Sequence, residues 1–108
     1  MANRHLSRSI VLQTLFEWDF AVSKDKDEPQ VMLDRNIEEF GPGLNDDEFI
    51  ATLYNGVLKK KEIIDEIIEK AAPDWPINKI SIVDRNILRL GLFELLFGDR
   101  TQVPPKVA

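Results

Sequence analysis

The sequence predicts an all-α protein, and three observations carry that prediction. Apolar residues recur at three- and four-residue spacings along most of the chain, which is the period of a helix with one buried face. Only five glycines and six prolines interrupt the 108 residues. The composition, 44% hydrophobic and 31% charged, is typical of a folded domain rather than a disordered chain. A chain of this length can bury one modest core, and we expect about four to five helices around it.

Composition also excludes several kinds of protein. The chain has no cysteine, so it holds no disulfide, no cysteine-ligated zinc and no thiol nucleophile. It has no apolar run long enough to span a bilayer and no signal-peptide pattern, so we expect a cytoplasmic protein with no membrane partner. The net charge is −5, but the acidity concentrates in residues 24–50, where nine acidic residues outnumber three basic ones. The acidic total therefore leaves room for a local anion-binding end.

The first predicted helix runs from about Arg4 to Ala21, with Asn3 as its N-cap. Arg4 and Arg8 continue its apolar face toward the N-terminus, so this face becomes cationic where the helix begins. A second apolar line lies to one side and consists of Leu12, Phe16 and Phe20. At helical spacing, such a line is either core or a surface for a partner protein.

Two further helices are expected between residues 29 and 72. A short helix covers about residues 29–40 and stops at the break Gly41-Pro42-Gly43. Asn45 and Glu48 are expected to form a capping pair at the start of the next helix. The apolar stripe of that helix keeps its register over residues 46–72, which predicts one long helix or two nearly collinear ones.

The last predicted helix, about Ile80–Phe97, is apolar on nearly all sides and therefore needs neighbours on all sides. Gly91 within it is expected to let a neighbouring element approach closely, since glycine there costs ~1 kcal/mol relative to alanine. The preceding helices are too few to surround it. We therefore expect an N-terminal helical subdomain over residues 1–72 and an incomplete C-terminal subdomain over residues 73–108. An exposed apolar surface on residues 82–97 would then support self-association.

No catalytic or metal-binding pattern is present in the sequence. There is no P-loop, and a single histidine without any cysteine leaves no set of metal ligands. We therefore predict no enzyme activity, no catalytic residue, no metal and no cofactor. Glu94 lies on an apolar line of the last helix and needs a partner, for which Arg85 or Arg89 is expected. Arg4 and Arg8, one turn apart at a helix start, can straddle adjacent phosphates.

Four segments together resemble the NusB family of bacterial transcription antitermination factors. They read NRHLSRSIVLQTLFEWDF, FIATLYNGVLKKKEIIDEIIEKAAPDW, ISIVDRNILRLGLFELLF and VPPKVA, and they cover nearly the whole chain in order. The resemblance implies a NusB-like pair of all-α helical bundles, C-terminally short here relative to the family. It implies binding of single-stranded boxA-type RNA of ribosomal RNA transcripts, together with NusE, a small-subunit ribosomal protein, in the transcription elongation complex.

The resemblance also implies which residues bind. Arg4, His5 and Arg8 match the basic helix start with which the family holds RNA. The partner-binding face is expected at Leu12, Phe16, Phe20, Asp84 and Arg85. Two alternatives remain open from the sequence. One is a helical RNA-binding domain of a ribosomal RNA methyltransferase, and the other is an RNA-independent helical adaptor or homodimer.

Overall fold

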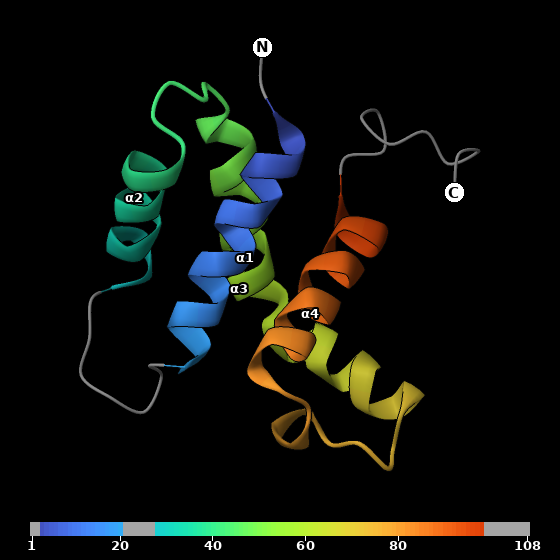
Figure 1. The fold of residues 1–108 in the computed structure, drawn as a ribbon. Helices are drawn as coiled ribbons and strands as arrows, with labels where there is room; N and C mark the ends of the chain where they lie inside the picture. Colours follow the sequence, from blue (N-terminus) through green and yellow to red (C-terminus); the bar gives the residue numbers. More distant parts are fainter. Residues whose placement is uncertain (1–2, 21–27, 99–108) are drawn as a thin grey trace.

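The computed structural model describes residues 3–20 and 28–98, and over these residues the protein is all-α, as the sequence predicts. Ala21 and the segment 103–108 lie outside the described residues. In Figure 1, α1 crosses in front of α3, with α2 on one side and α4 on the other. The elements in chain order are α1 (Arg4–Phe20), α2 (Pro29–Phe40), α3 (Asp47–Ala71), the single 3₁₀ turn η1 (Ile77–Lys79) and α4 (Ile82–Phe97).

Local side-chain chemistry sets where the helices begin. Asn3 caps α1 as predicted, because its Oδ1 accepts a hydrogen bond from the backbone N–H of Leu6 at 3.0 Å. Ser81 caps α4 in the same way, and α4 therefore begins two residues later than expected. The predicted capping pair at α3 is wrong. Asn45 has a left-handed backbone (φ 65°), and Asp46 is the N-cap residue, with its side chain used elsewhere.

The core lies where α1, α3 and α4 meet, and α2 packs against α1. The stripe predicted along α3 lies in one continuous helix and is buried from Ile50 to Ile68, which confirms its register over those residues, whereas its last predicted member, Ala71, is exposed. Tyr54, fully buried on α3, donates a hydrogen bond to the carbonyl of Pro29 at 2.9 Å and so ties down the start of α2. Burial raises the pKa of this phenol. The buried cluster consists of Ile10, Val11, Leu15, Leu33, Ile50, Leu53, Tyr54, Val57, Ile64, Ile68, Leu90 and Phe93.

The close crossing between α3 and α4 is made at Gly56, not at Gly91. A methyl group built on Gly56 would overlap the ring of Phe93, so only glycine admits that ring. A methyl group on Gly91 would meet nothing within 4 Å, which shows that the expectation for Gly91 was wrong. Gly91 instead belongs to the outward side of α4. The apolar side chains exposed on α4 are Val83, Ile87, Leu88, Leu95, Leu96 and Phe97, each between 40 and 63% exposed, as the sequence predicts.

Candidate nucleic-acid interface

The start of α1 brings Arg4 and Arg8 together over one aromatic ring. The guanidinium carbon of Arg4 lies 3.9 Å from the ring centroid of Phe49 on α3, and that of Arg8 lies 5.3 Å from it. Both distances are within the range of a cation–π interaction. The two side chains stay 40% and 37% exposed, and His5 between them is exposed as well. The three residues predicted for RNA binding therefore all reach the surface at this end of the bundle.

Each of these arginines is already paired with a carboxylate. Arg4 Nε lies 3.1 Å from Oδ2 of Asp46, which also accepts a 2.6 Å hydrogen bond from the buried hydroxyl of Ser7. Arg8 donates through Nε to both carboxylate oxygens of Glu94, at 2.9 and 3.0 Å, and its Nη2 lies 2.8 Å from Oε1. The partner of Glu94 is thus Arg8.

The expectation that Arg85 or Arg89 would pair with Glu94 is wrong. Glu94 lies at the end of α4 that packs beside the start of α1, whereas Arg85 and Arg89 lie nearer the other end of α4. Both arginines are held there by other carboxylates. Arg8 and Glu94 are 86 residues apart, so no local pattern in the sequence could reveal the pair.

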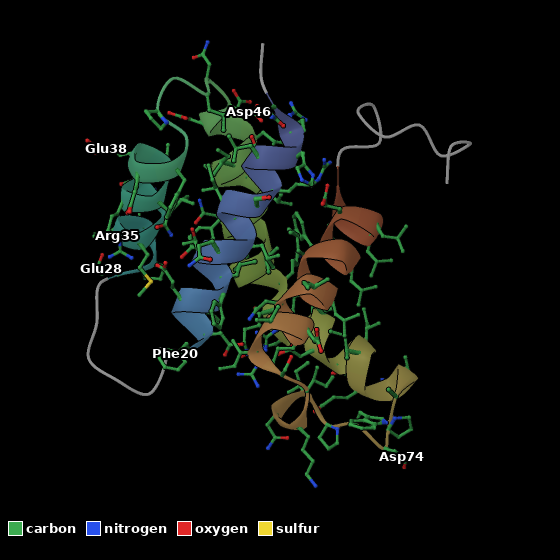
Figure 2. The ribbon with its side chains drawn as sticks, viewed as in Figure 1. Phe20, Glu28, Arg35, Glu38, Asp46 and Asp74 are labelled. Atoms are coloured by element: carbon green, nitrogen blue, oxygen red, sulfur yellow. The ribbon has the colours of Figure 1, made fainter. Side chains whose placement is uncertain are left out.

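A cavity of about 680 Å³ opens beside the paired arginines, between the starts of α1 and α3 and the end of α4. Its volume lies in the range of small-ligand sites. Its charge is mixed, because four carboxylates and two guanidinium groups line it. Figure 2 labels Asp46 at this end of the bundle. The lining residues are Arg4, Arg8, Asn45, Asp46, Asp47, Glu48, Phe49, Thr52, Leu53, Phe93, Glu94 and Gly98.

The residues predicted for partner binding lie toward the opposite end of α1. Phe20 is exposed and Phe16 half-buried, with their ring centroids 6.4 Å apart, and Leu12 packs against the edge of the core. Phe20 lies at the far end of α1 from Asp46 (Figure 2). Asp84 is exposed in the first turn of α4. Arg85 is mostly buried, and Asp19 of α1 holds it through hydrogen bonds of 2.5 and 2.7 Å.

Comparison with known proteins decides the family. A protein-family model with the description "NusB family" matches residues 5–108. The chain belongs to the NusB family. It is 38% identical over 105 residues to "Transcription antitermination protein NusB" of Desulforamulus reducens, covering 97% of this chain and 69% of the relative. It is 39% identical over 106 residues to the protein of the same name from Dehalococcoides mccartyi, covering 98% and 70%. No solved structure matches the chain.

This NusB-family chain also contains a buried ion network that the sequence analysis missed. Asp19 of α1 accepts hydrogen bonds from Arg85, Asn86 and Arg89 of α4. Arg89 in turn donates to both carboxylate oxygens of Asp65 on α3, at 2.8 and 2.9 Å. The signal in the sequence was a set of polar residues at helical spacing on an otherwise apolar helix. The network joins α1, α3 and α4.

The charges in this network move two pKa values. Burial raises the pKa of Asp19, but the hydrogen bonds from Arg85 and Asn86 and the charges of Arg89 and Arg85 outweigh it, so the pKa falls below 3.8. The hydrogen bond to Asp19 raises the pKa of Arg85, although burial opposes it. Asp19 is therefore held firmly as a carboxylate.

A metal site and a membrane span are two further features that residues 3–20 and 28–98 of this NusB-family member could have contained. That part of the chain contains no group of three or more His, Cys, Asp or Glu side chains placed to hold a metal ion. Its helices include none with the length and hydropathy needed to cross a membrane.

Proposed function

We propose that this chain is a cytoplasmic, non-catalytic transcription antitermination factor. In this proposal it binds single-stranded boxA-type RNA of ribosomal RNA transcripts together with NusE, within the transcription elongation complex. The observation that carries the proposal is membership of the NusB family over residues 5–108, since the curated relatives are named transcription antitermination proteins. The arrangement at the start of α1 supports it.

In the proposed RNA-binding site, phosphates are contacted by Arg4, His5 and Arg8. Cationic side chains and free backbone N–H groups at a helix start both attract phosphate. Because a carboxylate partly neutralises each arginine, we expect this chain alone to bind RNA weakly. A partner protein that shares the RNA would supply the missing affinity, and the coupling would be reciprocal. Three phosphate contacts on a single strand predict a shallow salt dependence, with a slope of about −2.

The proposed NusE-binding face combines Leu12, Phe16 and Phe20 of α1 with Asp84 and Arg85 of α4. The apolar side chains supply the buried area that such an interface needs, and aromatic residues are enriched in interface cores. Asp84 is exposed and offers its carboxylate to a cation on the partner. Arg85, held by Asp19, would act by fixing the first turn of α4 in place.

An RNA titration tests the proposal. Anisotropy of a fluorescein-labelled boxA RNA is measured with this chain, with NusE and with both, for the wild type and for Arg4→Ala/Arg8→Ala. We expect tight binding only with both proteins, and weaker binding for the double variant. Lys59→Ala/Lys79→Ala is the matched control, because it removes two exposed cations elsewhere and should change affinity less. Equal RNA affinity for the wild type and for Arg4→Ala/Arg8→Ala would refute the proposed RNA-binding site at the start of α1.

A second candidate function, self-association as a helical adaptor, is favoured by the apolar side of α4. Six large apolar side chains are exposed there in one helix, and a large exposed apolar area usually marks an interaction site. Sedimentation velocity over a concentration series tests it. A mass that stays at the monomer value at every concentration would contradict self-association.

A further inference from the structure

The carboxylates around the RNA-binding arginines give this site a built-in means of setting its affinity. We propose that Glu94 is an electrostatic brake on RNA binding, because it occupies the edge of Arg8 that a phosphate would use. This inference rests on the proposed RNA-binding function and concerns the same site.

The geometry of the Arg8–Glu94 pair carries the first step. Glu94 engages Nε and Nη2 of Arg8 at once, with contacts of 2.8 to 3.0 Å. These two nitrogens form one of the forked edges with which arginine binds carboxylate or phosphate bidentately. A phosphate that takes this edge has to displace Glu94, so the two anions compete for one set of donors.

The two carboxylates at the site differ in how easily they can leave. Asp46 is 8% exposed and is fixed by the 2.6 Å hydrogen bond from the hydroxyl of Ser7, which is fully buried. Glu94 is 25% exposed, lies in the last turn of α4 and lines the cavity. Glu94 is therefore the carboxylate that RNA displaces, and Asp46 is a permanent part of the arginine cluster.

The net charge at the cavity explains why the loss of the Glu94–Arg8 pair would raise RNA affinity. The two guanidinium groups and their paired carboxylates sum to zero, and Asp47 and Glu48 add further negative charge to the same cavity. An approaching phosphate therefore meets little net positive charge. When substitution removes the charge of Glu94, or a phosphate displaces its carboxylate, the positive charge of Arg8 at the helix start is no longer opposed there, and RNA affinity rises.

The experiment compares two neutralised carboxylates in the same cavity. Glu94→Gln removes the charge from the carboxylate that holds Arg8. Glu48→Gln removes the same charge from an exposed carboxylate that lines the same cavity. Both are measured by anisotropy with labelled boxA RNA and with labelled oligouridine of equal length, in the presence of NusE. Urea unfolding followed by circular dichroism checks that each variant is folded.

We expect Glu94→Gln to bind RNA about two- to fivefold more tightly than the wild type, since a partly exposed ion pair is worth up to that factor. Glu48→Gln should gain less. In an Arg8→Ala background, Glu94→Gln should gain nothing, because the carboxylate then has no arginine to restrain. Glu94 as a mere structural tie between α1 and α4 would instead leave RNA affinity unchanged or lower it.

Three results would overturn the brake. They are unchanged or weaker binding by Glu94→Gln, a gain no larger than that of Glu48→Gln, and a gain that persists with Arg8→Ala. The proposed function fails by a different result, namely equal RNA affinity of the wild type and Arg4→Ala/Arg8→Ala. If the wild type does not bind detectably, binding by Glu94→Gln supports the brake, and binding by neither overturns both proposals.

Discussion

Replacement of Arg89 by alanine should be among the most destabilising single changes in this chain. Arg89 is 3% exposed and lies between two buried carboxylates. It makes two hydrogen bonds to Asp65, one to Asp19 and one to the side chain of Asn86, all between 2.8 and 3.0 Å. In the alanine variant both carboxylates would remain buried, and each would have lost one of its cationic partners.

The expected loss follows from the charges left behind. Asp19 keeps its short pair with Arg85, whereas Asp65 keeps a longer, 3.2 Å pair with the more exposed Lys61, so the main cost arises at Asp65. Breaking a buried pair by removing one partner costs about 3–5 kcal/mol. The free energy of unfolding of a small domain is about 5–15 kcal/mol, so Arg89→Ala should remove a large share of it.

Urea unfolding, followed by circular dichroism at 222 nm, measures the loss. With a slope of about 2 kcal/mol/M, the midpoint should fall by about 2 M. Lys70→Ala is the control, because its ion pair with Glu66 is exposed and should contribute about 0.3–0.5 kcal/mol. Arg89→Met/Asp65→Asn should recover much of the stability, since no carboxylate is then left without a partner. A midpoint shift no larger than that of Lys70→Ala, or no recovery in the double variant, would refute the reasoning.

Three other predictions concern proton binding, helix crossing and association. The pKa of Asp19 in the folded state lies below 3.8, so its contribution to stability is complete above about pH 4 and is lost as the pH falls through the folded pKa. The stability difference between wild type and Asp19→Asn should therefore shrink in urea unfolding below about pH 4. Gly56→Ala should cost about 1–3 kcal/mol by overpacking, whereas Gly91→Ala should stabilise by up to about 1 kcal/mol in the same assay. Leu88→Glu/Leu95→Glu should sediment as a monomer at concentrations where the wild type associates, and equal association of both would contradict the role of the apolar side of α4.

The helices could be predicted because their signals are local. The cap at Asn3 and the stripe through α3 depend on residues within a few turns of each other, and both are present in the structure. The exposed apolar side of α4 could also be predicted, because a helix that is apolar all round needs more neighbours than the described residues provide.

The pairings between helices could not be predicted in this way. Whether a glycine lies at a helix crossing depends on which helix passes over it, and Gly56 and Gly91 look alike in the sequence. The carboxylate that pairs with Arg8 could not be predicted from the sequence either, because the pairing depends on how α1 packs beside α4. The cationic helix start was visible in the sequence, but its neutralisation by Asp46 and Glu94 was not.

The two ion pairs between α1 and α4, Asp19–Arg85 and Arg8–Glu94, have a consequence for synthesis on the ribosome. α1 is made first, yet the arginine that holds Asp19 follows it by 66 residues, and the carboxylate that holds Arg8 follows by 86. At about 5–20 residues per second, the longer separation, of 86 residues, corresponds to roughly 4–17 s of translation. During this interval α4 is not yet available, and among the described helices α2 and α3, as they emerge, are the ones that can cover the apolar face of α1. The nascent chain therefore completes its polar ties only when nearly all of the described residues have been made.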